Sequence, residues 1–148
     1  MRIYLDTSVL GGCFDEEFEE WSVPLMEAVR SGRYKAVISE VTEMELRYAP
    51  DSVKGLVQAI PSKQMEVHVL SEEAKELAAA YIKEKVVPRK SMADTQHIAV
   101  ASIARVDLLV SWNFKHIVNY DRIRLYNAVN LKLGYPLLEI RSPRDLIS

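Results

Sequence analysis

The sequence predicts a three-layer α/β/α sandwich around a mostly parallel central sheet. Most strand candidates are short, continuous apolar runs rather than alternating ones, as expected for strands that are buried on both faces. Helical patterns separate these runs, and strands that alternate with helices are typical of a parallel sheet covered on both sides. No internal repeat, proline-rich linker or break in composition divides the 148 residues. We therefore expect a single domain over residues 1–148.

The first half of the chain carries strand candidates at residues 2–5, 35–39 and 66–70. Helices are predicted at residues 23–30, from residue 42 to just before residue 50, and at residues 51–60. Ser22 is a suitable N-cap for the first helix, with Pro24 in its first turn, and Asp51 is a suitable cap for the third.

The second half of the chain begins with two predicted helices, from residue 71 to about residue 85 and from residue 91 to about residue 104. Each opens with a serine, which favours a helix start. A mainly apolar strand is predicted at residues 107–110, a helix at residues 122–131 and a final short strand at residues 137–140.

Composition limits the class of protein. A net charge of −2, from 19 basic and 21 acidic residues, is not that of a polycation. The single cysteine, Cys13, excludes an intrachain disulfide and fits a reducing compartment, where we expect it to be an inert thiol. Asp6 interrupts the first apolar run, which argues against a signal peptide, and the longest uncharged stretch, residues 95–104, is too short to cross a bilayer. We expect a cytoplasmic protein with no membrane partner.

The segment of residues 115–135 is locally basic. Its charged residues are one acid and four bases, and three tyrosines lie among them: Asp121; Lys115, Arg122, Arg124 and Lys132; Tyr120, Tyr126 and Tyr135. A basic and aromatic surface suits contact with a phosphate backbone. The same pattern is also typical of a solvated helix face beside buried tyrosines, so both interpretations stay open.

Three acids lie where carboxylates can converge in an α/β fold. Asp6 follows the first strand, Glu45 lies in the helix after the second strand, and Asp94 lies near the start of a later helix. Open α/β sheets place their sites beyond the carboxyl ends of the strands. Carboxylates that meet there repel one another unless a divalent cation lies between them, and oxygen ligands without a Cys or His cluster select Mg²⁺ or Mn²⁺. Such a site suits phosphoryl chemistry.

Each acid also has a local structural explanation. The three explanations are a turn and two capping motifs: Asp6-Thr7-Ser8, Thr42-x-x-Glu45 and Ser91-x-x-Asp94.

Four segments together carry a resemblance to a known family. They are Ile3-Tyr4-Leu5-Asp6-Thr7-Ser8, Thr42-Glu43-Met44-Glu45-Leu46, Ala93-Asp94-x-x-His97-Ile98-Ala99 and Leu108-Leu109-Val110-Ser111-Trp112-Asn113-Phe114. In this order and spacing they resemble the PIN-domain family of metal-dependent ribonucleases, especially the VapC-like toxins of toxin–antitoxin pairs, over nearly the whole chain. The resemblance implies a parallel sheet with an acidic pocket, one or two Mg²⁺ or Mn²⁺ ions, and endonucleolytic cleavage of RNA. It also implies a small antitoxin protein that covers the pocket, and a homodimer.

The resemblance assigns roles to individual residues. Asp6 matches the first aspartate of the family and Asp94 its third acid, so we expect both to be metal ligands. Glu45 matches the helical glutamate better than Glu43, which points about 200° away on the same helix. Family members usually place an aspartate at the fourth position, where this chain has Asn113. The expected catalytic residues are therefore Asp6, Glu45, Asp94 and Asn113, with a formal charge near −3 rather than −4.

Asn113 leaves alternative functions open. With Ser111 it can bind a metal through water or orient the attacking water in a one-metal enzyme, or the enzyme can be slow and use a phosphate of the RNA to complete a second metal shell. The alternative is a weakened PIN-like module that binds RNA or a protein partner without cleavage. A phosphatase of the haloacid dehalogenase kind is set aside, because that class needs a second aspartate where this chain has Ser8.

Five further residues in or near these segments each have more than one interpretation. His97 suits contact with a phosphate or proton transfer, or else partial burial with a bond to the backbone. His116 suits contact with RNA or a surface loop, and Trp112 suits stacking on a base or packing in the core. The hydroxyls of Thr7 and Ser8 suit orientation of the neighbouring carboxylate, a bond to metal-bound water, or capping of the turn.

Overall fold

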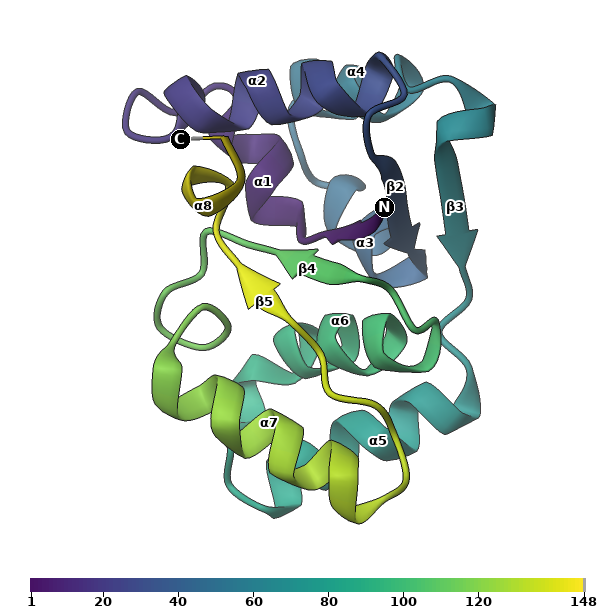
Figure 1. Ribbon diagram of the computed structural model, residues 1–148, viewed down its shortest axis with the longest axis vertical. Coiled ribbons are helices and arrows are strands. Elements are labelled where there is room, and N and C mark those ends of the chain that lie inside the picture. The colour runs from purple at the N-terminus through teal and green to yellow at the C-terminus, as the bar shows by residue number, and fades with distance from the viewer. Residues whose placement is uncertain (148) are drawn as a thin grey trace.

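The computed structural model describes residues 1–147 and places one five-stranded sheet between two layers of helices (Figure 1). The strands are β1 (Arg2–Leu5), β2 (Lys35–Ser39), β3 (Met65–His68), β4 (Leu108–Val110) and β5 (Ile140–Arg141). Their order is β3-β2-β1-β4-β5, and every neighbouring pair is parallel. The predicted α/β/α sandwich with a parallel sheet is confirmed.

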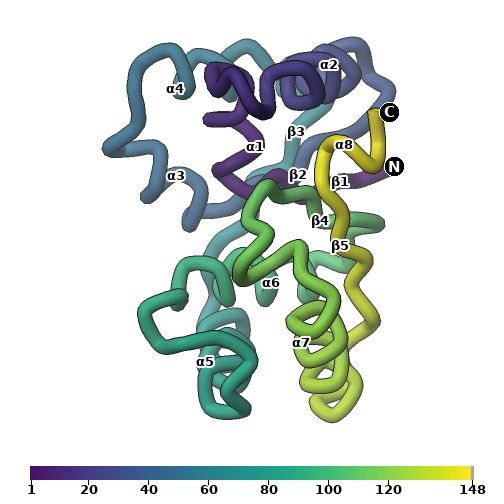
Figure 2. Tube along the Cα trace, turned by 90° about the vertical axis from the view of Figure 1, so that its left-hand side faces the viewer, coloured from purple at the N-terminus to yellow at the C-terminus, as the bar shows by residue number. Residues whose placement is uncertain are grey.

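Helices cover both faces of this sheet. They are α1 (Thr7–Gly12), α2 (Glu19–Arg30), α3 (Glu40–Leu46), α4 (Asp51–Gln58), α5 (Glu72–Lys83), α6 (Met92–Ile103), α7 (Tyr120–Lys132) and α8 (Pro143–Ile147), with 3₁₀ turns at Ser62–Gln64 and Arg89–Ser91. Figure 2 shows α1, α2, α4 and α8 on one side of the sheet and α5, α6 and α7 on the other. Within residues 1–147, none of the helices combines the length and the apolar character needed to cross a membrane.

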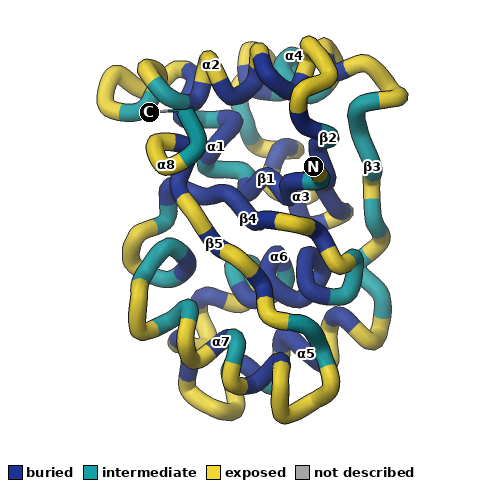
Figure 3. The backbone as a smooth tube through the Cα atoms, in the orientation of Figure 1, coloured by how far each residue is buried: buried dark blue, intermediate teal, exposed yellow. Residues whose placement is uncertain are grey.

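Side chains of the central strands alternate between two cores. In β1, Ile3 and Leu5 join the core with α1, α2 and α4, whereas Tyr4 joins the core with α5, α6 and α7. The strands β2 and β4 repeat this alternation, and Figure 3 shows all three as buried segments. Each fully buried large side chain contributes about 1.5–3 kcal/mol relative to its exposed state. Burial on both faces explains why these strands are continuous apolar runs.

Neither α1 nor α8 follows from the sequence pattern. Helix α1 is short and ends in Gly11 and Gly12, which favour a turn over a helix when only local propensity counts. At Gly12, tertiary packing requires a glycine inside the helix in spite of its low helix propensity. A Cβ atom there would lie 2.6 Å from Ser22 Oγ and 2.7 Å from Trp112 Nε1, so only glycine fits.

Helix α2 begins at Glu19, earlier than predicted, and the assignment of Ser22 as its N-cap is wrong. Ser22 is buried inside the helix, where its Oγ accepts a hydrogen bond from Trp112 Nε1 over 2.8 Å. Phe18 occupies the N-cap position without a side-chain cap and stacks on Trp112 at 4.2 Å between ring centroids. Aromatic packing therefore sets where this helix starts.

Helix α3 begins at Glu40, and the predicted capping box between Thr42 and Glu45 is wrong. Ser39 is the N-cap, and its Oγ accepts a hydrogen bond from the Val41 amide over 3.1 Å. Thr42 Oγ1 accepts in return from the Ser39 amide over 3.2 Å. Because Ser39 and Thr42 complete the cap, the Glu45 carboxylate is free for other contacts.

Three further boundaries differ from the prediction. Asp51 is the first residue of α4 rather than its cap, and α7 begins at Tyr120, with Asn119 as N-cap. Strand β5 begins only at Ile140.

The order of the strands creates a switch point between β1 and β4. From β1 the chain builds β2 and β3 toward one edge, and then β4 and β5 toward the other. Asp6 follows β1, Ser111 follows β4, and the Asp6 amide donates to the Val110 carbonyl over 3.0 Å. Open α/β sheets form their sites outside the carboxyl ends of the strands at such a point.

Candidate functional site

Asp6 lies at the switch point with its carboxylate held from two sides. Its Oδ2 accepts hydrogen bonds from Ser8 Oγ over 2.6 Å and from Ser111 Oγ over 2.8 Å. The residue is 5% exposed. Two hydroxyls fix the orientation of the carboxylate and leave Oδ1 on the side of His97, whose Nε2 lies 3.5 Å away. Of the alternatives for Ser8, the structure shows orientation of the neighbouring carboxylate.

Glu45 extends from α3 toward Asp6. Its Oε1 accepts a hydrogen bond from Thr7 Oγ1 over 2.7 Å and contacts His97 Nε2 over 2.5 Å. Burial by itself raises the pKa of Glu45, but the hydrogen bond and the charge of His97, together with the bond from Thr7, lower it overall. Glu45 is thus held in its ionised form.

His97 is fully buried in α6, and both of its ring nitrogens contact side chains rather than backbone. Nδ1 lies 2.6 Å from Tyr4 Oη. Burial opposes protonation of the ring, but Tyr4, Glu45 and Asp6 outweigh it and raise the pKa of His97 well above its usual value. The sequence signal for this position was its spacing, one helical turn after Asp94.

Asp94 lies in the first turn of α6 and completes the acidic surroundings. Burial raises the pKa of Asp94 to about 6, with further contributions from the charges of Asp6 and Glu45, against the lowering effects of His97 and Asn113. The cap-like role of Ser91 is absent, because the Ser91 side chain makes no capping bond in residues 1–147. Burial is the main cause of this raised pKa, and the repulsion from Asp6 and Glu45 adds a smaller part that a cation would relieve.

Asn113 follows Ser111 on the same loop, and its side chain acts on the loop and on Asp94. Its Oδ1 accepts hydrogen bonds from the amides of Lys115 over 3.2 Å and His116 over 2.9 Å. Asn113 also acts on Asp94, whose pKa it lowers slightly against the larger effect of burial. The oxygen that the sequence offers as a metal ligand is therefore engaged in a turn.

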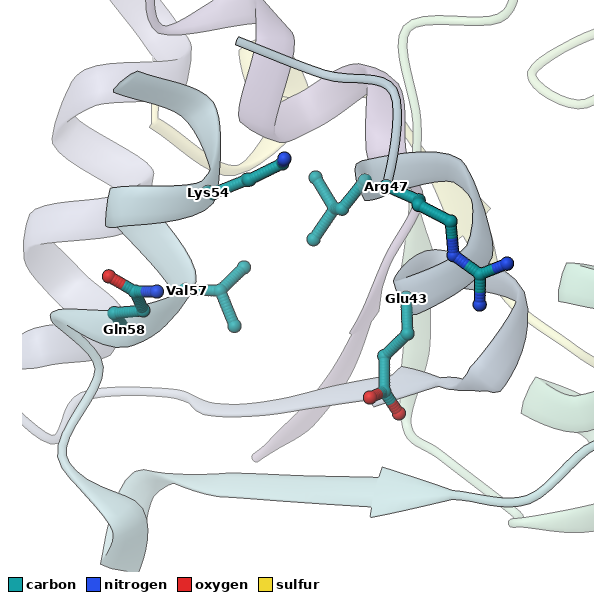
Figure 4. Close-up of a pocket in the computed structure, with 6 residues that line it drawn as sticks. Glu43, Arg47, Lys54, Val57 and Gln58 are labelled. Carbon is teal, nitrogen blue, oxygen red and sulfur yellow. The ribbon is translucent and has the colours of Figure 1, made fainter. Parts of the chain in front are cut away.

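Glu43 and Glu45 face different surroundings although only one residue separates them on α3. Figure 4 shows Glu43 at a shallow pocket between α3 and α4, with Arg47 and Lys54. Leu46, Val57 and Gln58 complete its lining. Glu45 instead contacts α1 and α6 through Thr7 and His97. This geometry favours Glu45 over Glu43 as the acid of the site.

The donor set of the site fits a divalent cation. Carboxylate oxygens of Asp6 and Glu45 lie within 4.8 Å of each other and of a ring nitrogen of His97. After the larger effect of burial, the charges of both acids raise the pKa of Asp94. Carboxylate oxygens are the ligands that Mg²⁺ and Mn²⁺ prefer.

A group of positive charges lies around His116, in the segment after Asn113. Lys115, Arg122 and Lys90 all lower the pKa of His116, after the larger effect of its burial. The His116 carbonyl accepts a hydrogen bond from Tyr126 Oη over 2.9 Å. We call Lys90, Lys115 and Arg122, which surround His116, the cationic rim. After the larger effect of burial, Asp94 raises the pKa of Tyr126 and Arg122 of the rim lowers it.

Burial separates the other aromatic residues and the cysteine that the sequence singled out. Trp112 is 6% exposed, so it packs rather than presenting a stacking face. Tyr126 is buried, whereas Tyr120 is 74% exposed. Burial raises the pKa of Cys13 to about 11, which keeps the thiol in its unreactive form.

The chain matches the PIN domain family model over residues 3–117. A crystal structure of VapBC2 from Rickettsia felis, bound to a DNA fragment from their promoter, is similar with a TM-score of 0.58 and 14% identity, over 96% of this chain and 98% of that one. A crystal structure of DNA-bound VapBC from Salmonella typhimurium is similar with a TM-score of 0.60 and 18% identity, over 97% and 98% of the two chains. At these identities the likeness to solved structures is one of fold. No curated protein matches the chain.

Proposed function

The chain belongs to the PIN domain family, and from this premise we propose that it is a metal-dependent endoribonuclease that cleaves RNA phosphodiester bonds. The observation that carries the proposal is the pairing of the Asp6 and Glu45 carboxylates at the switch point of the sheet, with charges that raise the pKa of the partly buried Asp94. Neighbouring carboxylates repel one another, and a bound cation between them would offset this repulsion.

In this proposal Asp6 and Asp94 hold the divalent ion, Mg²⁺ or Mn²⁺, with Glu45 beside them. A bound ion of this kind supplies a nucleophilic hydroxide and stabilises charge on the scissile phosphate. Ser8 and Ser111 fix the Asp6 carboxylate through their hydrogen bonds to Oδ2, and Thr7 fixes Glu45. Asn113 holds the loop after β4 in place through the bonds that its Oδ1 accepts from the amides of Lys115 and His116.

The cationic rim supports a polyanionic substrate. Phosphates of an RNA strand carry negative charge that the acidic pocket alone would repel, and cations beside the pocket offset this repulsion. Tyr120, which is 74% exposed, has Arg124 placed 5.7 Å over its ring and offers a face on which a base can stack.

We further propose that the protein is the toxin of a toxin–antitoxin pair in the cytoplasm, where a small antitoxin covers the acidic pocket, and that it forms a homodimer. The support is the fold that it shares with VapBC crystal structures.

The test is cleavage of a labelled RNA pool by the wild type and by Asp6→Asn, each with Mn²⁺, Mg²⁺ or EDTA. Asp51→Asn in α4 is the matched control, since it removes an exposed aspartate. We expect cleavage by the wild type and the control, none in EDTA, and none by Asp6→Asn. Metal-dependent cleavage that survives in Asp6→Asn would refute the site.

The second candidate is a binding module without cleavage, which is favoured by Asn113 at the usual fourth acid. Wild-type protein that binds RNA or a protein partner but leaves RNA intact with every metal would establish it.

A further inference from the structure

His97 is tied through both ring nitrogens into one series of side-chain contacts. Nδ1 lies 2.6 Å from Tyr4 Oη, which lies 2.7 Å from Ser39 Oγ. Nε2 lies 2.5 Å from Glu45 Oε1. Thr7 Oγ1 donates to the same oxygen over 2.7 Å. The series runs from the end of β2 through β1 and α6 to α3 and α1.

The contact with Glu45 determines where the imidazole proton lies. An ionised carboxylate only accepts hydrogen bonds, so Nε2 must be the donor. This holds whether Nδ1 accepts from Tyr4 or donates to it, because a hydroxyl does either. A ring nitrogen that carries a proton has no lone pair with which to bind a metal ion. The imidazole is thus committed to hydrogen bonds on both sides.

Full burial of His97 also separates it from substrate. The side chain is 0% exposed. A buried imidazole is tolerated when both of its nitrogens have partners, and Tyr4 and Glu45 provide them. No ring atom remains for a phosphate, so the interpretation of His97 as an RNA contact does not fit this geometry.

The contacts of His97 restrict the side-chain conformation of Glu45. Its side chain is 37% exposed, and a glutamate on a helix surface samples several rotamers unless it is held. Thr7 from α1 and His97 from α6 both contact Oε1, which fixes the carboxylate from two sides. The second oxygen, Oε2, has no such donor among residues 1–147 and remains available.

We propose that His97 is a positioning residue for Glu45: its Nε2–H holds Oε1 so that Oε2 faces the metal and the attacking water, and His97 itself binds neither metal nor RNA. The expected effect of His97 on the rate of RNA cleavage rests on the proposed nuclease function, whereas the hydrogen bond between His97 and Glu45 does not.

Two spectroscopic measurements test the assignment without measuring cleavage. In metal-free protein with ¹⁵N-labelled histidine, NMR should show His97 Nε2 protonated, with an N–H signal that changes in Glu45→Ala. In protein loaded with Mn²⁺ alone, pulsed EPR should show no directly bound imidazole nitrogen. An unprotonated Nε2, or a bound nitrogen signal that disappears in His97→Gln, would overturn the proposal. If Mn²⁺ does not bind, the NMR result still decides it.

Kinetics then separate positioning from other roles. His97→Leu removes the donor and should lower kcat by about 10- to 100-fold with little change in KM for RNA. His97→Gln keeps an amide donor and should restore part of kcat. His68→Gln is the matched control, because the His68 ring contacts Glu66 on the edge strand rather than Glu45. Equal losses in the two His97 variants, with native circular dichroism, would show that another property of the ring is used.

The outcomes distinguish this proposal from the nuclease function itself. A wild type that cleaves no RNA with any metal refutes the nuclease function and leaves the NMR to judge the hydrogen bond. A nuclease whose His97→Leu variant keeps full kcat refutes the positioning role alone. If His97→Leu fails to fold, Tyr4→Phe removes the hydroxyl that contacts His97 Nδ1 and Ser39 Oγ, leaves Nε2 in place, and should give a smaller loss of kcat in the same direction.

Discussion

Ser111 Oγ donates a hydrogen bond to Asp6 Oδ2 over 2.8 Å, and this bond joins the carboxyl ends of β4 and β1 across the switch point of the sheet. Ser8 donates to the same oxygen. The two hydroxyls fix the orientation of this carboxylate. Asp94 lacks such hydroxyl donors in residues 1–147, and burial, with a smaller contribution from two neighbouring acids, raises its pKa to about 6. The site therefore contains one carboxylate that two hydroxyls hold and one whose charged form burial disfavours.

Asp94→Asn should stabilise the metal-free protein. At pH 8 the substitution removes a charge that burial, Asp6 and Glu45 disfavour, for a gain of about 1–2 kcal/mol in the free energy of unfolding. Urea unfolding in EDTA measures this gain, with Asp121→Asn on exposed α7 as the control. The rise in melting temperature that Mn²⁺ gives the wild type should be lost. Unchanged or reduced stability in EDTA would contradict the account of Asp94.

Gly12→Ala should destabilise the protein, whereas Gly11→Ala should not. A Cβ at Gly12 would meet Ser22 Oγ at 2.6 Å and Trp112 Nε1 at 2.7 Å, and overpacking of this kind costs about 1–3 kcal/mol. A Cβ at Gly11 meets nothing within 4 Å, and alanine there should add about 0.5–1 kcal/mol through helix propensity. Thermal unfolding followed by tryptophan fluorescence measures both. Equal effects of the two substitutions would refute the close packing of α1 on α2.

Glu66→Gln should lower stability at neutral pH but not in acid. Hydrogen bonds from Arg2 at 2.8 and 2.9 Å are the largest cause that lowers the pKa of Glu66 to about 2. A lowered pKa contributes stability above the unfolded value near 4.5, and this contribution is lost as the pH falls toward 2. The pair is partly exposed, so screening limits the contribution to about 1 kcal/mol.

Urea unfolding at pH 7 and at pH 2.5 measures the contribution of Glu66, with Glu72→Gln as the control. Glu72 forms an exposed pair with Lys75 within one helix, and its loss should matter little at either pH. A Glu66→Gln deficit that persists unchanged in acid would contradict the ion-pair explanation.

Removal of charge from the cationic rim should weaken RNA binding without removing the metal site. Lys90→Gln with Lys115→Gln should reduce the slope of log affinity against log salt by about 1–2, as expected for two lost phosphate contacts. Fluorescence anisotropy with single-stranded RNA in EDTA measures the slope. Lys54→Gln with Lys63→Gln removes the same charge elsewhere, and an equal effect of this control would show that the rim has no special role.

Much of the fold follows from local pattern. The strands β1, β2 and β4 are continuous apolar runs because both faces are buried, and that property is visible in the sequence. Helix α1 cannot be predicted from the sequence, because its two glycines disfavour a helix. The reason for the glycine at position 12, its close packing against Ser22 and Trp112, is seen only in the tertiary structure. The start of α3 was predicted at Thr42 instead of at the Ser39 cap, because either residue can cap a helix and spacing alone does not distinguish them.

The candidate acids were predictable, whereas their supports were not. Asp6, Glu45 and Asp94 follow from the family resemblance and from the rule for strand ends. The hydrogen bonds that hold them join residues far apart in the chain, as in Ser111 with Asp6 and His97 with Glu45. No local periodicity records such pairs, so the hydroxyls and the buried imidazole gain their roles only from the tertiary structure.

Asn113→Asp tests whether the loop after β4 faces the metal. One carboxylate oxygen can keep the turn that Asn113 Oδ1 makes with the amides of Lys115 and His116. The other replaces the amide group, which now lowers the pKa of Asp94, with a negative charge. We expect lower stability in EDTA, because like charges repel, but tighter Mn²⁺ binding and faster cleavage. Titration calorimetry with Mn²⁺ measures the affinity, and Asn127→Asp on α7, whose amide bonds with the Leu138 backbone, is the control. Equal or weaker Mn²⁺ affinity in Asn113→Asp would place this side chain outside the metal site.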